Sequence, residues 1–311
     1  EESLLKAVRS LETGVCHIYH KKFDKWSNDD LLAYIKGGTD DRLYAIGQLI
    51  RNGVDLALIY DKTKIDMFFL EKFKNIVEFE NVVRAHPMDV ETLRAAKRMG
   101  FSDKYIGQLW GLSQNEMYRL REKNNVFPVY KMIDTCASEF ASYVPYFYST
   151  YEEENESIVS GKEKIIVLGS GPIRIGQGVE FDYSTVHAIW SIRAAGYEAI
   201  IINNNPETVS TDYTTSDKLY FEPLTVEDVM NVIHLEKPKA IVVSLGGQTA
   251  INLAEPLAEL GVPIIGTDTQ AIKNAEDRGC FERIMEELGI PQPEAEAVTD
   301  IESGVRAAAR I

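Results

Sequence analysis

The sequence predicts an all-α helical domain followed by an α/β domain with a parallel, doubly wound sheet. From residue 1 to about residue 151 the apolar residues recur with helical spacing. From residue 157 onward, short apolar runs alternate with helical patterns, which is typical of parallel strands joined by helices. The acidic segment 151–156 between them is polar and has no period, which indicates a linker. We therefore place the helical domain at 1–156 and the sheet domain from 157.

The first domain should consist of short helices. Apolar positions predict helices near 29–35 and 41–50, each opened by paired aspartates and closed by glycine. Further helices are predicted at Ile65–Val83, Asp89–Arg98, Ser102–Trp110 and Ser113–Lys123.

The second domain should alternate strands with helices. Strands are predicted at Lys164–Gly169, Glu198–Asn203, Ala240–Leu245 and Pro263–Ile265. The helices are predicted at Asp182–Ala195, Thr225–Glu236, Thr249–Leu260, Thr269–Ala275 and Arg278–Leu288. Ligands of such sheets bind at the carboxyl ends of the strands.

Composition limits the classes of function. The chain has 311 residues and a net charge of −15, which gives no general attraction for nucleic acid or anionic lipid. Its three cysteines are isolated, which favours a reducing compartment, and we expect a cytoplasmic protein. No apolar run is long enough to cross a membrane, and the first residues lack the pattern of a signal peptide. The chain starts without Met and stops inside a predicted helix, so we expect both ends to be cut.

The stretch GSGPIRIGQG, residues 169–178, follows the first predicted strand and holds four glycines. A dinucleotide fingerprint would need glycine at position 174, where Arg174 stands, and an acid at the end of the second strand, which ends in three asparagines. No Gly-Lys-Ser or Gly-Lys-Thr completes a P-loop. What remains is a long loop in which Arg174 offers an anion a forked donor, or a plain strand-to-helix turn with a surface arginine.

Two more polar loops follow later strands. Residues 203–212 close the second strand, and residues 244–249, with Gly246, Gly247 and Gln248, close the third. Carboxyl ends of parallel strands meet at one edge, so these loops should converge with the first, which includes Gly169 and Gly171. The sequence therefore predicts a site at this edge.

Four motifs in register show a family resemblance. GSGPIRIGQGVEFDYSTVHA, NNNPETVSTDYTTSDKLYFEP, SLGGQTAINLAEPL and AEDRGCFERIMEELGIPQP resemble the carbamoyl phosphate synthetase large subunit at the start of its carboxyl-terminal synthetase half. The segments TDDRLYAIGQLIRNGV and YDKTKIDMFFLEKFKNIVEFE resemble the oligomerisation domain of that family. The resemblance covers nearly the whole chain.

The resemblance implies a domain organisation and a reaction. It implies an oligomerisation domain at 1–156, a Rossmann-like pre-ATP-grasp domain at 157–293 and the truncated start of an ATP-grasp domain at 294–311. The parent enzyme makes carbamoyl phosphate for arginine and pyrimidine synthesis from bicarbonate, ammonia and two MgATP. This region belongs to the carbamate-phosphorylating half. A small glutamine amidotransferase subunit supplies the ammonia, and the helical domain forms homo-oligomers, with no nucleic acid or membrane as a partner.

Site residues follow from the same resemblance. Arg278 matches an arginine at the edge of the ATP pocket, although it could also be a helix-surface arginine. Gly176, Gln177 and Gly178 match a loop beside the interior passage for carbamate, and Glu207 matches an acid near that passage, although it could be a turn carboxylate. The family often reads FDYCC where this chain has Ser184 and Thr185, which we interpret as a variation in helix packing.

The groups that hold ATP and Mg²⁺ in the family would lie past residue 311, so we expect this chain to be inactive alone and to supply no metal ligands. Phosphoryl transfer depends on placing metal ions and cations around the transferred group.

Two hypotheses come from other classes of protein. Residues 100–118 resemble a DNA-binding helix-turn-helix, and residues 94–131 hold eight basic and three acidic residues. The helical half could instead be a non-catalytic interaction module. Its aromatic residues would then either anchor a partner or fill the domain's own core, and they are Phe68, Phe69, Phe73, Trp110, Tyr146, Phe147 and Tyr148. His17 and His20 share a helical spacing, but a zinc site needs three or four ligands and no others lie nearby.

Overall fold

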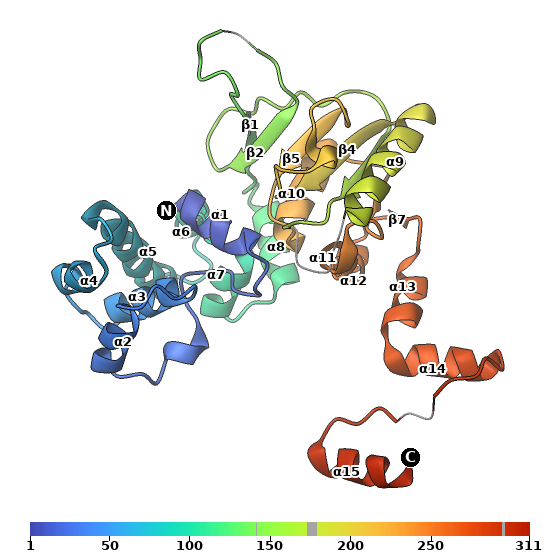
Figure 1. Cartoon of the computed structure of the whole chain (residues 1–311). Helices are drawn as coiled ribbons and strands as arrows, with labels where there is room; N and C mark the ends of the chain where they lie inside the picture. The colour runs from blue at the N-terminus through green and yellow to red at the C-terminus, as the bar shows by residue number, and fades with distance from the viewer. Residues whose placement is uncertain (141, 173–178, 294–295) are drawn as a thin grey trace.

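The computed structural model describes residues 1–140, 142–172, 179–293 and 296–311. Figure 1 shows a helical half, built by the first part of the chain, beside a sheet with its own helices. The last three helices lead away from both.

The helical half consists of eight α-helices and one 3₁₀ turn among the described residues before 125. They are α1 Glu2–Ser10, η1 Lys21–Phe23, α2 Asn28–Tyr34, α3 Arg42–Arg51, α4 Leu56–Thr63, α5 Met67–Ala85, α6 Val90–Arg98, α7 Asp103–Trp110 and α8 Gln114–Lys123. Six of these helices begin after a Ser or Asp whose side chain accepts a backbone N–H of the first turn. The four helices predicted between residues 65 and 123 form within two residues of their expected bounds.

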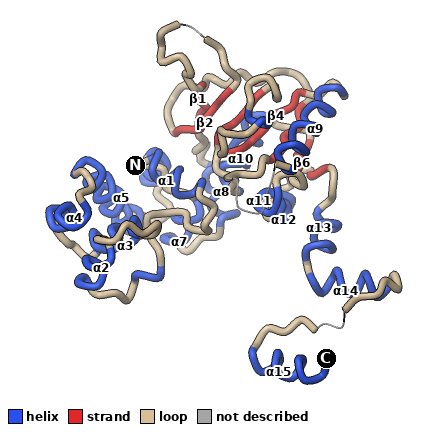
Figure 2. The backbone as a smooth tube through the Cα atoms, viewed as in Figure 1, coloured by secondary structure: helices blue, strands red, loops and turns tan. Residues whose placement is uncertain are grey.

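The sheet has seven strands, and Figure 2 shows them as one layer with helices around it. The strands are β1 Val129–Met132, β2 Tyr146–Thr150, β3 Lys164–Leu168, β4 Glu198–Asn203, β5 Lys218–Phe221, β6 Ala240–Val242 and β7 Ile264–Ile265. Their order is β1-β2-β5-β4-β3-β6-β7, and all neighbours are parallel except β1 and β2. Chain order reverses between β3 and β6, which is where ligands of such sheets bind.

Helices cover both faces of the sheet. They are α9 Glu180–Ala194, α10 Val226–Glu236, α11 Gly247–Ile251 and α12 Ala254–Glu259, with a short turn η2 at Val209–Thr211. Side chains of β3 alternate: Ile166 and Leu168 pack in one core with α10 and α12, while Ile165 and Val167 pack in another with Ile189 of α9. The final helices are α13 Thr269–Glu276, α14 Arg278–Glu287 and α15 Ile301–Arg310.

The structure corrects three expectations. The segment before residue 156 is not all helical, because β1 and β2 join the sheet through pairs such as Phe147 with Tyr220. β5, another strand of four residues, was also missed. The helix expected at Thr249–Leu260 is interrupted at Asn252 and Leu253, since the ring of Pro256 would clash with the carbonyl of Asn252 in a continuous helix.

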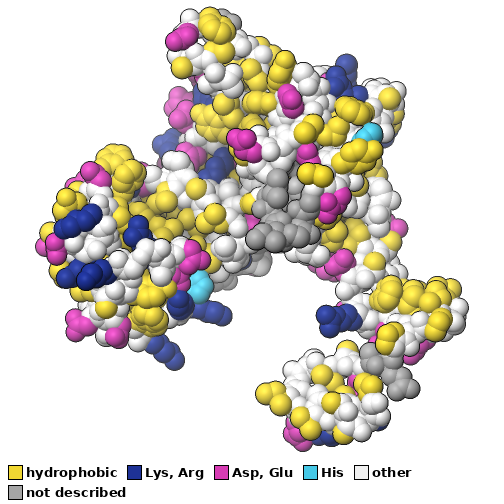
Figure 3. Space-filling model, viewed as in Figure 1, with side chains coloured by type: hydrophobic (Ala, Val, Ile, Leu, Met, Phe, Trp, Pro, Cys, Tyr) yellow, Lys and Arg dark blue, Asp and Glu magenta, His cyan; other side chains and the backbone are white. Residues whose placement is uncertain are grey.

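The outermost helices expose apolar side chains. On α14 and α15, Phe281 is 44% exposed, Val305 66% and Ile301 88%. Figure 3 shows hydrophobic side chains gathered on this part of the surface.

Candidate functional site

The loops that follow β3, β4 and β6 meet at the carboxyl edge of the sheet. The amide of Gly169 donates to the carbonyl oxygen of Ile202 at 2.9 Å. The amide of Gly171 donates to Asn203 Oδ1 at 3.0 Å. A Cβ on Gly246 would overlap the carbonyl oxygen of Gly169. The structure therefore brings together the first, second and third polar loops.

Glycines at this edge allow the loops to approach. A Cβ on Gly169 would lie 2.5 Å from Cγ of Asn203, so a larger residue would push the first two loops apart. Gly247 has φ +64, and a Cβ there would lie 3.3 Å from the ring of Phe181 on α9. Arg174, Gly176, Gln177 and Gly178 lie outside the described residues.

The second loop is held at both ends. Asn203 is 1% exposed, and its Nδ2 has no hydrogen-bond partner among the described residues. At the far end, Asp182 of α9 accepts hydrogen bonds from the amides of Val209 and Ser210 at 2.9 and 3.0 Å. Thr185 is 1% exposed in the same helix, which fits our interpretation of Ser184 and Thr185 as a packing variation.

Glu207 and Arg278 take no part in the contacts between loops described above. Glu207 is exposed, and its amide donates to Asn205 Oδ1 at 3.0 Å. Arg278 is exposed as the first residue of α14, after Asp277, which caps that helix by accepting from the amide of Cys280 at 2.8 Å. The third loop contacts α13, since Gln248 Nε2 donates to Glu276 Oε2 of that helix at 3.1 Å.

The helical half supplies a fourth wall that the sequence analysis missed. Asn204 Nδ2 donates to the carbonyl oxygen of Ser10 at 3.0 Å. Thr249 Oγ1 donates to Glu12 Oε2 at 2.7 Å. A cavity of about 400 Å³ lies between the halves, lined among others by Arg9, Glu12 and Thr249. Periodicity could not have found this wall, because its contacts join residues more than 190 positions apart.

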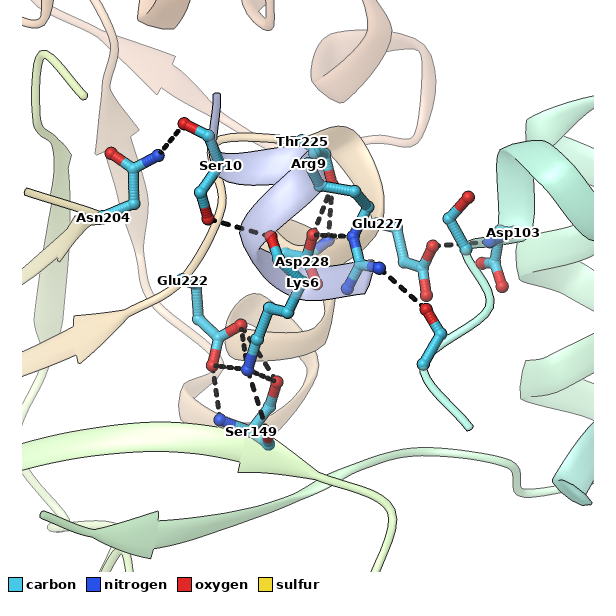
Figure 4. A network of polar contacts seen from close by, with 12 residues as sticks. Lys6, Arg9, Ser10, Asp103, Ser149, Asn204, Glu222, Thr225, Glu227 and Asp228 are labelled. Carbon is cyan, nitrogen blue, oxygen red and sulfur yellow. Dashed lines mark hydrogen bonds and ion pairs between the residues drawn. The ribbon is translucent and has the colours of Figure 1, made fainter. Parts of the chain in front are cut away.

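Buried ion pairs fasten the two halves behind this edge (Figure 4). Lys6 Nζ lies 3.0 Å from Glu222, and Arg9 Nε lies 3.6 Å from Asp228. Lys97 contacts Glu227 directly. Burial alone would raise the pKa of Glu227, but Lys97 and nearby arginines lower it to about 2. The orientation of the fourth wall is therefore set by paired charges that are mostly buried.

No group of three or more His, Cys, Asp or Glu that could hold a metal ion occurs within the described ranges. His17 is buried, with Nε2 at 3.0 Å from Glu80, and His20 accepts the amide of Lys22 at the start of η1. His17 and His20 do not form a site for Mg²⁺, and no step of a reaction is assigned to that ion.

Among the described residues, no helix is long and apolar enough to span a bilayer.

The structure weakens the helix-turn-helix hypothesis, because two of its basic residues are buried. α7 and α8 do meet at Gly111, which has φ 72. Lys97 and Arg121, however, are 2% and 0% exposed, and both are bound to Asp103. Two of the cations counted toward a phosphate-binding patch are therefore inside the protein.

Sequence families match both halves. Residues 1–125 match the carbamoyl-phosphate synthetase large chain, oligomerisation domain, and residues 161–274 match the carbamoyl phosphate synthase preATP-grasp domain.

Several solved structures align with part of this chain. The biotin carboxylase domain of a thermophilic 2-oxoglutarate carboxylase bound to ADP is 20% identical, with a TM-score of 0.32 over 47% of this chain and 33% of that one. The Hydrogenobacter thermophilus domain with MgADP, ADP and bicarbonate is 20% identical, with a TM-score of 0.36 over 49% and 34%. A Rhizobium etli pyruvate carboxylase with acetyl coenzyme A is 13% identical, with a TM-score of 0.35 over 47% and 14%. This chain thus spans about a third or less of these structures.

Proposed function

The chain belongs to the large-chain family of carbamoyl phosphate synthases through both of its halves, and on this premise we propose that it serves the half that phosphorylates carbamate. The complete enzyme would make carbamoyl phosphate from bicarbonate, ammonia and two MgATP, as an ATP-dependent carbon-nitrogen ligase in the cytoplasm. Its product would supply arginine and pyrimidine synthesis.

The observation that carries this proposal is the pairing of two domains of one protein in one chain. An oligomerisation domain at 1–125 is followed by a preATP-grasp domain at 161–274. A lone α/β match would leave many chemistries open, because similar sheets serve unrelated functions. The strand order β5-β4-β3-β6-β7 supports a Rossmann-like assignment, since numbered from β3 it reads 3-2-1-4-5.

The sheet edge would form one wall of the active site. Close packing at Gly169, Gly171 and Gly246 would make this wall rigid, because each of these glycines lies directly against another loop or against Glu12. Glu207 would lie at the passage for carbamate, and Arg278 would contact the nucleotide at the edge of its pocket. Both side chains are exposed, which leaves them accessible to a ligand. MgATP itself would be held mainly by residues other than those described.

The surface of the helical half supports the proposed homo-oligomer. Phe68 and Phe69 on α5 are 58% and 56% exposed. Sedimentation velocity should show a smaller species when both are changed to Ser, while Trp190→Ser, an exposed residue of α9, should leave the species unchanged. The small glutamine amidotransferase subunit is the other proposed partner, and it would deliver ammonia to the complete enzyme.

Reading the coding sequence around this chain tests the proposal first. We expect a complete synthetase half upstream and an ATP-grasp domain downstream. The complete protein with its glutaminase partner should then form carbamoyl phosphate from glutamine, bicarbonate and ATP. This chain alone should release no ADP from ATP and carbamate above a no-protein blank. A stop codon directly after Ile311 would refute the ligase assignment and favour an interaction module.

A further inference from the structure

Glu12 has an unusual backbone conformation at the boundary between the halves. It follows α1 with φ 55, in the left-handed region that residues other than glycine seldom adopt. Such a conformation persists where the surrounding contacts require it, and it often marks a functional position.

The position of α1 is set independently of Glu12. Lys6 binds Glu222 and the carbonyl oxygen of Ser149, the latter at 2.9 Å. Arg9 donates to the carbonyl oxygen of Gly100 at 2.8 Å and lies near Asp228. Figure 4 shows these contacts on both sides of the helix. These contacts fix the position of the end of α1 at the sheet edge. The turn at Glu12 then directs its carboxylate toward Thr249.

The carboxylate of Glu12 contacts two of the converging loops. Its Oε2 accepts the hydroxyl of Thr249 in α11 at 2.7 Å. Its Oε1 occupies the space that a Cβ on Gly171 would need. Glu12 therefore bridges the loop after β3 and the helix after β6, which also pack on each other through Gly246 and Gly169.

We propose that Glu12 is a positioning residue of the carbamate-phosphorylating site, through which the helical half holds residues 169–171 and α11 in register. The reaction named here rests on the proposed function, whereas the contacts of Glu12 do not depend on it. A carboxylate would repel an anionic substrate, so Glu12 acts through Gly171 and Thr249 rather than by touching carbamate or phosphate. The site is then incomplete without the helical half.

Two variants isolate this role. Glu12→Ala removes the carboxylate, and Thr249→Val removes the donor while it keeps the shape of the side chain. Ser27→Ala is the matched control, because it removes the N-cap of α2, far from the sheet edge, and lowers stability without touching the loops. The double variant of Glu12 and Thr249 completes a cycle that measures their coupling.

The first measurement is hydrogen exchange in this chain. Glu12→Ala should speed exchange of the amides of residues 169–171 and 247–250 by about fivefold, the scale of one lost hydrogen bond. Ser27→Ala should leave those amides unchanged. Equal exchange in Glu12→Ala and Ser27→Ala would overturn the proposal.

The second measurement uses the complete enzyme. Synthesis of ATP from ADP and carbamoyl phosphate, which reports the carbamate-phosphorylating half in reverse, should lose about tenfold in kcat in Glu12→Ala and Thr249→Val. The double variant should lose little more than either alone, and bicarbonate-dependent ATP hydrolysis at the other half should not change. Additive losses, or equal losses in both reactions, would contradict a positioning role. If the wild-type enzyme forms no carbamoyl phosphate, the proposed function fails and hydrogen exchange alone decides the role of Glu12.

Discussion

Arg121 of α8 and Asp103 of α7 form an ion pair of 2.7 Å in which both side chains are almost fully buried. The same guanidinium donates to Asn231 Oδ1 of α10 at 3.0 Å and to the carbonyl oxygen of Val126 at 3.2 Å. Arg121 therefore ties the helical hairpin α7–α8 to a helix that covers the sheet. A buried charge of this kind stabilises the protein only while its partners stay in place.

Arg121→Met should destabilise the protein strongly. The substitution leaves Asp103 with Lys97 as its remaining cation and Asn231 without its donor, and removing one partner of a buried pair typically costs about 3–5 kcal/mol. Urea unfolding followed by circular dichroism gives the change in free energy of unfolding. Arg119→Met is the control, since Arg119 is exposed on the same helix and its loss should cost less than about 0.5 kcal/mol. Similar losses in both variants would show that the buried pair contributes nothing.

Glu80 should make the stability of the helical half depend on pH. Burial alone would raise the pKa of Glu80, but its hydrogen bonds with His17 and Arg51 hold that pKa at about 2. Because the folded-state pKa is depressed, the stabilisation is present above the unfolded value of 4.5 and is lost as pH falls toward 2. The contribution is roughly 3 kcal/mol.

Thermal unfolding of Glu80→Gln between pH 6 and pH 2.5 checks this expectation. The variant should be less stable than the wild type at pH 6, and the difference should shrink as the pH falls. Glu71→Gln, an exposed residue of the same helix, should follow the wild-type curve. A constant difference between Glu80→Gln and wild type across this range would contradict the role assigned to Glu80.

Much of the fold follows from local pattern, whereas the contacts between halves do not. α7 and α8 could be predicted from the sequence, because the N-cap residues Ser102 and Ser113 stand where the helical spacing of apolar residues begins. β5 was missed because it is short and begins with Lys218, whose burial depends on distant partners such as Glu236 at 2.6 Å. β1 and β2 are also short, and they join the sheet only in series, because β2 pairs with β5 and β1 pairs with β2.

The candidate site shows the same division. The convergence of the three polar loops could be expected from the parallel arrangement alone, since their strands end at one edge. The contacts of Glu12 could not be predicted from the sequence, because they depend on where α1 packs. Ion pairs such as Lys6 with Glu222 determine that packing. Residues that act across a domain boundary leave no local period in the sequence.

Gly246→Ala should force the first and third loops apart. A Cβ at this position would overlap the carbonyl oxygen of Gly169 and lie 2.6 Å from Cβ of Ala250. Overpacking of this kind typically costs about 1–3 kcal/mol. Gly38→Ala is the matched control, since a Cβ there meets nothing within 4 Å. Urea denaturation should place Gly246→Ala well below both wild type and control, and an unchanged midpoint would show that the loops are not in fixed contact.

Arg278→Ala should weaken nucleotide binding in the complete enzyme without a loss of stability. Arg278 is exposed, so its removal should disturb little of the fold. If it contacts the nucleotide at the edge of its pocket, the KM for ATP in carbamate phosphorylation should rise about tenfold, the scale of one hydrogen bond to a charged group. Arg283→Ala, also exposed on α14, is the control and should leave KM unchanged. Equal KM values in the two variants would place Arg278 on an ordinary helix surface, and the nucleotide would then have to be held without it.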